Sequence, residues 1–254
     1  MQVRRANPPR QPLAHAVPLT RLVSIWMAAF AGGGWPCQGV LAEPVAACST
    51  DGQALVIANA RYGSHEVAGA RAAAERVAAA FRTAGLQVVR HDDLAAKDVL
   101  AAVREFADRT PTNGAAVIYF AGLGGQCLVN DDREACIQGT GAPRAAAELE
   151  KDSIPVAAIL GALRERSSAR LLCLLIDASG PNPFQPEGHP RGMGAAPDLA
   201  DDEVVCFAAA PGRIAPSTDG DAAAAFGAAV ADEMPSAARS VSEWLDRVRE
   251  AVVT

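Results

Sequence analysis

The segment LLCLLID at residues 171–177 is the most apolar of the predicted strands and indicates the fold class. A continuous apolar run of this length is too short for a typical helix and fits a strand covered on both faces. The runs AAVIYFA at 115–121 and QALVIAN at 53–59 have the same character. Such strands belong to parallel sheets, because the crossover connections of these sheets place helices over both faces.

The segments between these strands have helical periodicity. Apolar residues recur at helical spacing in 67–84 and 97–109. The same patterns predict further helices at 154–166, 221–233 and 240–252, and further strands at 86–90 and 204–209. Alternating strands and helices predict an α/β fold of three layers, with a mostly parallel central sheet and helices on both faces. In proteins with such sheets, catalytic and binding residues lie beyond the carboxyl ends of the strands, which here are segments 59–65, 121–126 and 177–184.

Composition excludes several classes of protein. Half of the 254 residues are apolar and 20% are charged, which is not a disordered composition, and no period of 20 to 50 residues repeats as in a solenoid. Four of the 23 basic residues and none of the 29 acidic ones precede residue 43, so the remainder carries 19 basic against 29 acidic groups, a net charge of −10. A surface of this charge repels phosphate backbones, and no nucleic-acid partner is expected.

The first 42 residues resemble an export signal. A basic, proline-containing start is followed by the apolar run LVSIWMAAFA at 22–31, and small residues precede Ala42. We therefore expect a signal peptide over 1–42 with cleavage after Ala42, a linker over 43–52, a domain over 53–254, and a periplasmic or secreted protein outside the membrane. A membrane anchor is the alternative, but Gly32–Gly34 and Pro36 interrupt the run. Lipidation at Cys48 is disfavoured by Glu43 and Pro44, which lie where a lipoprotein signal is still apolar.

The cysteines of the predicted mature chain suggest one pairing. Cys127 and Cys136 flank the polar stretch LVNDDREA, which is a plausible hairpin tip. In an oxidising compartment the two could form a disulfide; the alternative is two unrelated thiols. Cys173 and Cys206 lie in apolar runs and are expected to be buried thiols. No spacing resembles a zinc site, and no metal or cofactor is expected.

Four segments together resemble the caspase-like peptidase family, in particular its bacterial metacaspase and orthocaspase members. In chain order they are ALVIANARYG (54–63), IYFAGLGGQ (118–126), LLIDASGPNPF (174–184) and FAAAPG (207–212). The resemblance extends over roughly residues 50 to 252. It implies the three-layer fold that caspases share with the hemoglobinase-like peptidases, and it implies a cysteine endopeptidase ancestry.

The resemblance also implies a catalytic pair that this chain lacks. The family histidine, which activates the nucleophile, falls on Leu123, and the family cysteine falls on Ser179. A leucine side chain accepts no proton, and a serine hydroxyl is a weak nucleophile without an adjacent base. The resemblance assigns Gly124 to the oxyanion site and Asp177 to the pocket for a basic substrate side chain. Structural alternatives are that Leu123 fills space, Ser179 shapes a turn and Asp177 binds backbone N–H groups.

Three functional hypotheses follow. The first is an exported pseudopeptidase that binds a peptide or protein partner without cutting it. The second is an active hydrolase that uses Ser179 with a substitute base, His65 or His189. The third is a generic Rossmann-like or flavodoxin-like domain with a small ligand. Gly122, Gly124 and Gly125 follow a strand as phosphate loops do, but they lead into a polar hairpin rather than into a helix. The family label alone would name an active peptidase; the sequence leaves the partner, the oligomeric state and any calcium dependence open.

Overall fold

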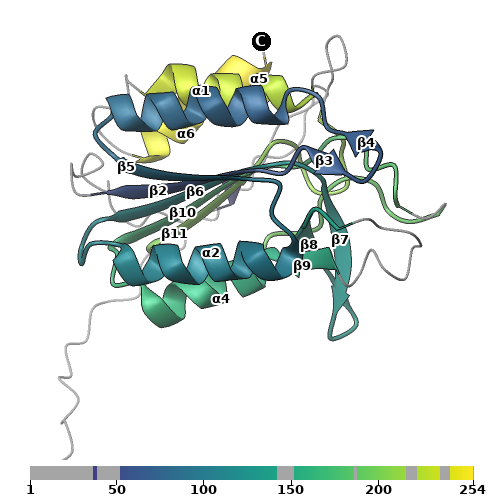
Figure 1. Ribbon diagram of the computed structural model, residues 1–254, viewed down its shortest axis with the longest axis horizontal. Helices are drawn as coiled ribbons and strands as arrows, with labels where there is room; N and C mark the ends of the chain where they lie inside the picture. Colours follow the sequence, from purple (N-terminus) through teal and green to yellow (C-terminus); the bar gives the residue numbers. More distant parts are fainter. Residues whose placement is uncertain are drawn as a thin grey trace, which may run out of the picture.

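A six-stranded sheet forms the centre of the molecule (Figure 1). The computed structural model describes residues 37–38, 52–141, 152–185, 188–215, 222–234 and 241–253. The strands lie in the order β1 (Cys37–Gln38), β11 (Glu203–Phe207), β10 (Leu171–Asp177), β6 (Ala115–Ala121), β2 (Gln53–Ala58) and β5 (Gln87–Asp92). All neighbouring pairs are parallel except β1 with β11.

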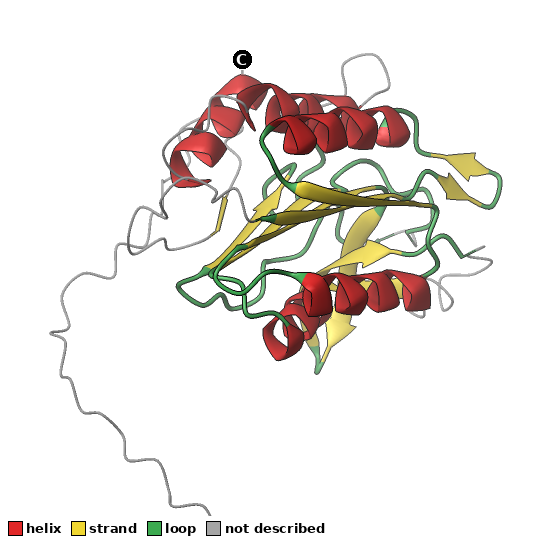
Figure 2. Ribbon diagram, turned by 60° about the vertical axis from the view of Figure 1, so that its left-hand side comes forward, coloured by secondary structure: helices red, strands yellow, loops and turns green. Residues whose placement is uncertain are grey.

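Helices cover both faces of this sheet. Figures 1 and 2 show one helical layer on each side of it, with α1 (Ala70–Thr83), α5 (Ala222–Glu233) and α6 (Val241–Val253) on one side and α2 (Ala96–Arg109) and α4 (Val156–Arg166) on the other. The two apolar clusters on the two faces take alternate residues of each strand, since successive side chains of a strand point in opposite directions. The predicted three-layer α/β fold is therefore confirmed.

Two small sheets lie beyond the carboxyl ends of the central strands. One is the hairpin of β3 (Arg61–Tyr62) and β4 (His65–Glu66). The other joins β7 (Gly124–Val129), β8 (Asp132–Gln138) and β9 (Ser153–Pro155). Asn130 and Asp131 form the β7–β8 turn with φ of 51° and 71°, and positive φ at both central residues matches the strand twist of a two-residue hairpin.

Two helices begin more than one residue away from their predicted starts. α1 begins at Ala70 rather than at Val67, because Gly69 has a φ of 77° and interrupts the helical backbone. α4 begins at Val156 rather than at Ile154, since Ile154 pairs with Ile137 of β8 as part of β9. Helical periodicity and a short strand cannot be told apart over two residues.

Most of the predicted export segment and linker lies outside the described residues. The exceptions are Gly52 and the two residues of β1, whose backbone pairs with β11. Cys48, the residue considered for lipidation, also lies outside them. Among the helices that the structure does describe, none has the length and apolarity needed to span a bilayer.

Candidate functional site

Three central strands end at the same edge of the sheet. The register aligns Ala58 of β2, Ala121 of β6 and Asp177 of β10. Backbone hydrogen bonds continue beyond the strands, from Asn59 N–H to the Ala121 carbonyl (2.8 Å) and from Gly122 N–H to the Asp177 carbonyl (3.1 Å). The segments that sequence reasoning selected for the site therefore do meet at one place.

Leu123 is held by its backbone at this edge. Its N–H donates to the Tyr62 hydroxyl (2.9 Å), and its carbonyl accepts from the Gln138 N–H (2.9 Å). The Tyr62 hydroxyl in turn donates to the Gln138 carbonyl (3.3 Å). The Leu123 side chain is 3% exposed and has no group that can carry a proton. The backbone of Leu123, the position to which the resemblance assigns a histidine, is thus fixed, while its side chain has no acid–base chemistry.

Ser179 is buried at the end of β10. The residue is 1% exposed, and its hydroxyl has no hydrogen-bond partner among the residues that the structure describes. His65 packs edge-on against Phe184, with ring centroids 5.7 Å apart, and His189 is exposed in the loop after Phe184. Within the described residues, therefore, no imidazole lies at hydrogen-bonding distance from the Ser179 hydroxyl.

Gly124 lies against two neighbours that leave no room for a side chain. A Cβ atom there would be 2.5 Å from the Met193 Sδ and 2.8 Å from the Ala178 Cβ. Met193 is 0% exposed, so its side chain fills the space beside this glycine. The close packing explains the glycine by itself, and an oxyanion role for its N–H stays a prediction.

Residues 191–195 hold Met193 in this position. The Gly194 N–H donates to the Gly125 carbonyl (3.3 Å), the Ala195 carbonyl accepts from the Ala135 N–H (3.1 Å), and the Met193 carbonyl accepts from the Gly212 N–H (2.9 Å). The segment is therefore bound both to the β7–β8 hairpin and to the turn after β11. Sequence reasoning missed Met193, because a single methionine in a Gly- and Pro-rich loop carries no local signal.

Asp177 points into the core beneath the helices. Its Oδ2 accepts from the Tyr119 hydroxyl (2.8 Å), and its carboxyl also accepts from the Gly227 N–H of α5. Burial raises the pKa of Asp177 to about 8, although the hydrogen bonds from Tyr119 and Gly227 oppose the shift. A Cβ at Gly227 would be 2.5 Å from the Tyr119 hydroxyl. Asp177 thus binds a backbone N–H group, which the sequence left open, and its substrate role stays a prediction.

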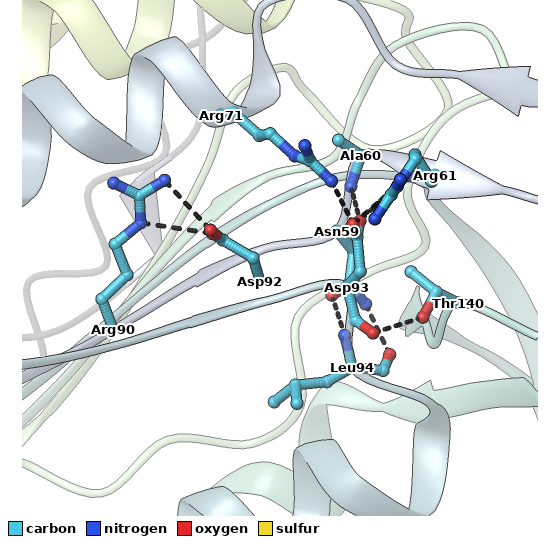
Figure 3. A network of polar contacts seen from close by, with 9 residues as sticks. All are labelled: Asn59, Ala60, Arg61, Arg71, Arg90, Asp92, Asp93, Leu94 and Thr140. Atoms are coloured by element: carbon cyan, nitrogen blue, oxygen red, sulfur yellow. Dashed lines mark hydrogen bonds and ion pairs between the residues drawn. The ribbon is translucent and has the colours of Figure 1, made fainter.

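Asn59 connects three segments at the same edge, and Figure 3 shows its contact with one of them, at Leu94. Its Nδ2 donates to the carbonyls of Leu94 and Gln138 (3.0 Å each), and its Oδ1 accepts from the Leu94 N–H (2.9 Å). The side chain is buried and uses both amide protons and its carbonyl oxygen. This residue therefore joins the end of β2 to the turn before α2 and to the end of β8.

Asp93 makes a second connection beside it (Figure 3). Its Oδ1 accepts from the N–H groups of Ala60 and Arg61 (2.9 Å each), and its Oδ2 pairs with the guanidinium groups of Arg61 and Arg71. Burial acts to raise the pKa of Asp93, but these hydrogen bonds and the Arg71 charge outweigh it and lower the pKa. Sequence reasoning did not select Asp93, although its place directly after a strand was a usable signal.

Cys127 and Cys136 both lie in the hairpin and are not joined by a disulfide. They lie on neighbouring strands, and the Cys136 thiol hydrogen-bonds to the Cys127 thiol. The disulfide stays a prediction. No group of three or more potential metal-ligating side chains occurs within the described ranges.

Comparison with known proteins places the chain in one family. A family model described as a caspase domain matches residues 51–254, which is most of the chain and all four of the segments quoted from the sequence. A search of curated proteins found no match.

Proposed function

The chain belongs to the caspase-domain family, and from that premise we propose that it is a member without peptidase activity. In this proposal the domain binds a peptide or protein partner and does not cut it. The observation that carries the proposal is the pair of replaced positions, Leu123 and Ser179, each buried and each without the chemistry of peptide hydrolysis.

The surroundings of these two residues support the proposal. The Ser179 hydroxyl has no base beside it among the described residues, so its proton has no acceptor. Leu123 is buried, and its backbone is hydrogen-bonded to Tyr62 and to Gln138. Losing either member of a catalytic pair removes most of the rate, and the second loss then adds little.

An active serine hydrolase is the competing function, and the histidine positions argue against it. His65 is in contact with Phe184, and His189 is exposed in a loop. For this function one of them has to move to within about 3 Å of the Ser179 hydroxyl, directly or through one water. The buried Ser179 also has to become accessible to a substrate carbonyl.

We further propose that the domain is of the bacterial metacaspase type and that it is exported after cleavage behind Ala42. The Asp-Ala pair before Ser179 supports the subtype, and the basic and apolar start of the chain supports export. N-terminal sequencing of the protein from the periplasmic or secreted fraction should begin at Glu43. A chain that keeps residues 1–42, or that stays in the cell, would refute export without touching the peptidase question.

The test for catalysis uses peptides that contain arginine or lysine. We expect the purified wild-type chain and Ser179→Ala to release product at the same background rate. We also expect no labelling of Ser179 by a fluorophosphonate probe. Turnover by the wild type that disappears in Ser179→Ala, or labelling at Ser179, would show an active hydrolase. Proteins that copurify with the chain from the exported fraction would then identify the partner.

A further inference from the structure

The β7–β8 hairpin presents two cysteines on one face. The strand register places Gly125 opposite Cys136 and Cys127 opposite Glu134, so the cysteines are diagonal neighbours. Residues two apart on a strand share a face, and the Cα atoms of diagonal partners in an antiparallel pair lie about 7 to 8 Å apart, so a disulfide between them needs a small backbone movement. The influence of Cys127 on the pKa of Cys136 agrees with the register in making the two thiols neighbours.

This hairpin is more accessible to an oxidant than the central sheet. Cys127 is 8% exposed and Cys136 is 1% exposed, but the neighbouring Leu128 is 55% exposed and the turn residues are on the surface. Local opening of a hairpin end needs less free energy than opening of a core strand. Cys173 and Cys206, in contrast, lie within β10 and β11 beneath a helical layer.

We propose that Cys127 and Cys136 form a redox couple, which closes a reversible disulfide by exchange with a small-molecule disulfide such as glutathione disulfide. The Cys127 thiolate attacks one sulfur of the reagent, forms a mixed disulfide and releases one thiol. Cys136 then attacks the Cys127 sulfur, forms the internal bond and releases the second thiol. Two protein thiols are oxidised, and one disulfide is reduced to two thiols.

The order of the two steps follows from the surroundings of the thiols. Cys127 is the more exposed of the two and meets the reagent first. The hydrogen bond to Cys127 and burial both raise the pKa of Cys136, so Cys136 stays protonated until the mixed disulfide has formed beside it. Diagonal partners are wider apart than directly opposed ones, and a disulfide that draws them together is more easily reduced. The couple is thus suited to reversible use.

A disulfide between Cys127 and Cys136 would stiffen the β7–β8 hairpin, which borders the candidate site. The hairpin begins at Gly124, and its Ala135 N–H holds the Ala195 carbonyl. The proposal does not depend on whether Ser179 is catalytic, so its failure and the failure of the proposed function are separate results.

A digest after Arg133 gives a direct readout. Trypsin cuts between the two cysteines, so the fragments 110–133 and 134–144 stay together only if the disulfide joins them. We expect the full chain, equilibrated folded in an excess of glutathione disulfide and then alkylated, to give the linked pair, and an excess of dithiothreitol to abolish it. Cys206→Ala is the matched control and should still give the linked pair. Cys136→Ser should leave glutathione on Cys127 alone.

A second readout is the midpoint of thermal unfolding. Oxidised wild type should unfold several degrees above reduced wild type, because a closed loop restricts the unfolded chain, and Cys136→Ser should show no such difference. The proposal is overturned if folded wild type yields no linked fragments, if it stops at the mixed disulfide, or if Cys127 pairs with another cysteine. The wild-type digest decides this even if a variant does not fold.

Discussion

Two neighbouring regions at the carboxyl edge of the sheet differ in how completely their polar side chains are hydrogen-bonded. In the region of Asn59 and Asp93, the Asn59 amide and the Asp93 carboxylate have partners on other segments (Figure 3). In the region of Leu123 and Ser179, one side chain is aliphatic and the other is a buried hydroxyl with no partner among the described residues. The first region holds loops in place; the second contains the two positions to which the resemblance assigns the catalytic pair.

The difference shows that the framework and the reaction depend on different residues. Asn59 fixes the turn before α2 and the end of β8, and Tyr62 fixes the backbone of Leu123. None of these bonds requires a histidine at position 123 or a cysteine at position 179. The shape of the site therefore does not depend on a catalytic pair at these two positions.

Replacing Asn59 should cause the largest loss of stability. Asn59→Ala leaves the Leu94 N–H without its partner and removes one of two donors from each of the carbonyls of Leu94 and Gln138. We expect the free energy of unfolding to fall by about 3 to 5 kcal/mol. Urea denaturation measures this, with the exposed Gln87→Ala as a control that should change it by less than about 0.5 kcal/mol. A loss below about 1 kcal/mol would mean that the network does not hold the edge.

For a change of one pH unit, the pH dependence of stability should be the next largest effect. The pKa of Asp177 is raised to about 8, so between its ordinary value of 3.8 and 8 the folded state keeps a proton that the unfolded state loses. Stability from this group is complete below pH 4 and declines as the pH rises toward 8, by up to about 1.4 kcal/mol per pH unit. Denaturation at several pH values should show this decline in the wild type and not in Asp177→Asn. An equal slope in both would contradict the buried, neutral carboxyl.

Adding a methyl group beside Met193 should have a moderate effect. Gly124→Ala places a Cβ against the Met193 Sδ and the Ala178 carbonyl, and we expect a loss of about 1 to 3 kcal/mol. Gly125→Ala is the matched variant, since its Cβ meets only the movable end of the Gln185 side chain closely. Equal losses in the two variants would indicate that Met193 does not occupy the space beside Gly124.

Ser179→Ala should have the smallest effect and the opposite sign. Removing a buried hydroxyl without a partner should leave stability unchanged or raise it by up to about 1 kcal/mol. The melting temperature of wild type and variant, measured in one buffer, gives the answer. A clear loss would show that the hydroxyl is bonded and that the two regions are less different than described.

The sequence predicted the elements well and the contacts of the site only in part. The limits of β6 and β10 were predicted to the residue, because runs such as AAVIYFA combine burial on both faces with a suitable length. The edge that carries Leu123, Gly124 and Ser179 was also predicted. The direction of Asp177 and the roles of Tyr62 and Met193 were not, since they depend on contacts between segments 50 to 76 residues apart, which no local pattern encodes.

The anchoring of Met193 has a kinetic consequence. Backbone hydrogen bonds join residues 191–195 to the β7–β8 hairpin and to Gly212. Any ligand that needs contact with Gly124 therefore competes with the Met193 side chain, which these bonds keep beside the glycine. The apparent dissociation constant then equals the intrinsic constant divided by the fraction of molecules in which the tethered group has left. At saturating ligand, the observed association rate would level off at the departure rate of Met193.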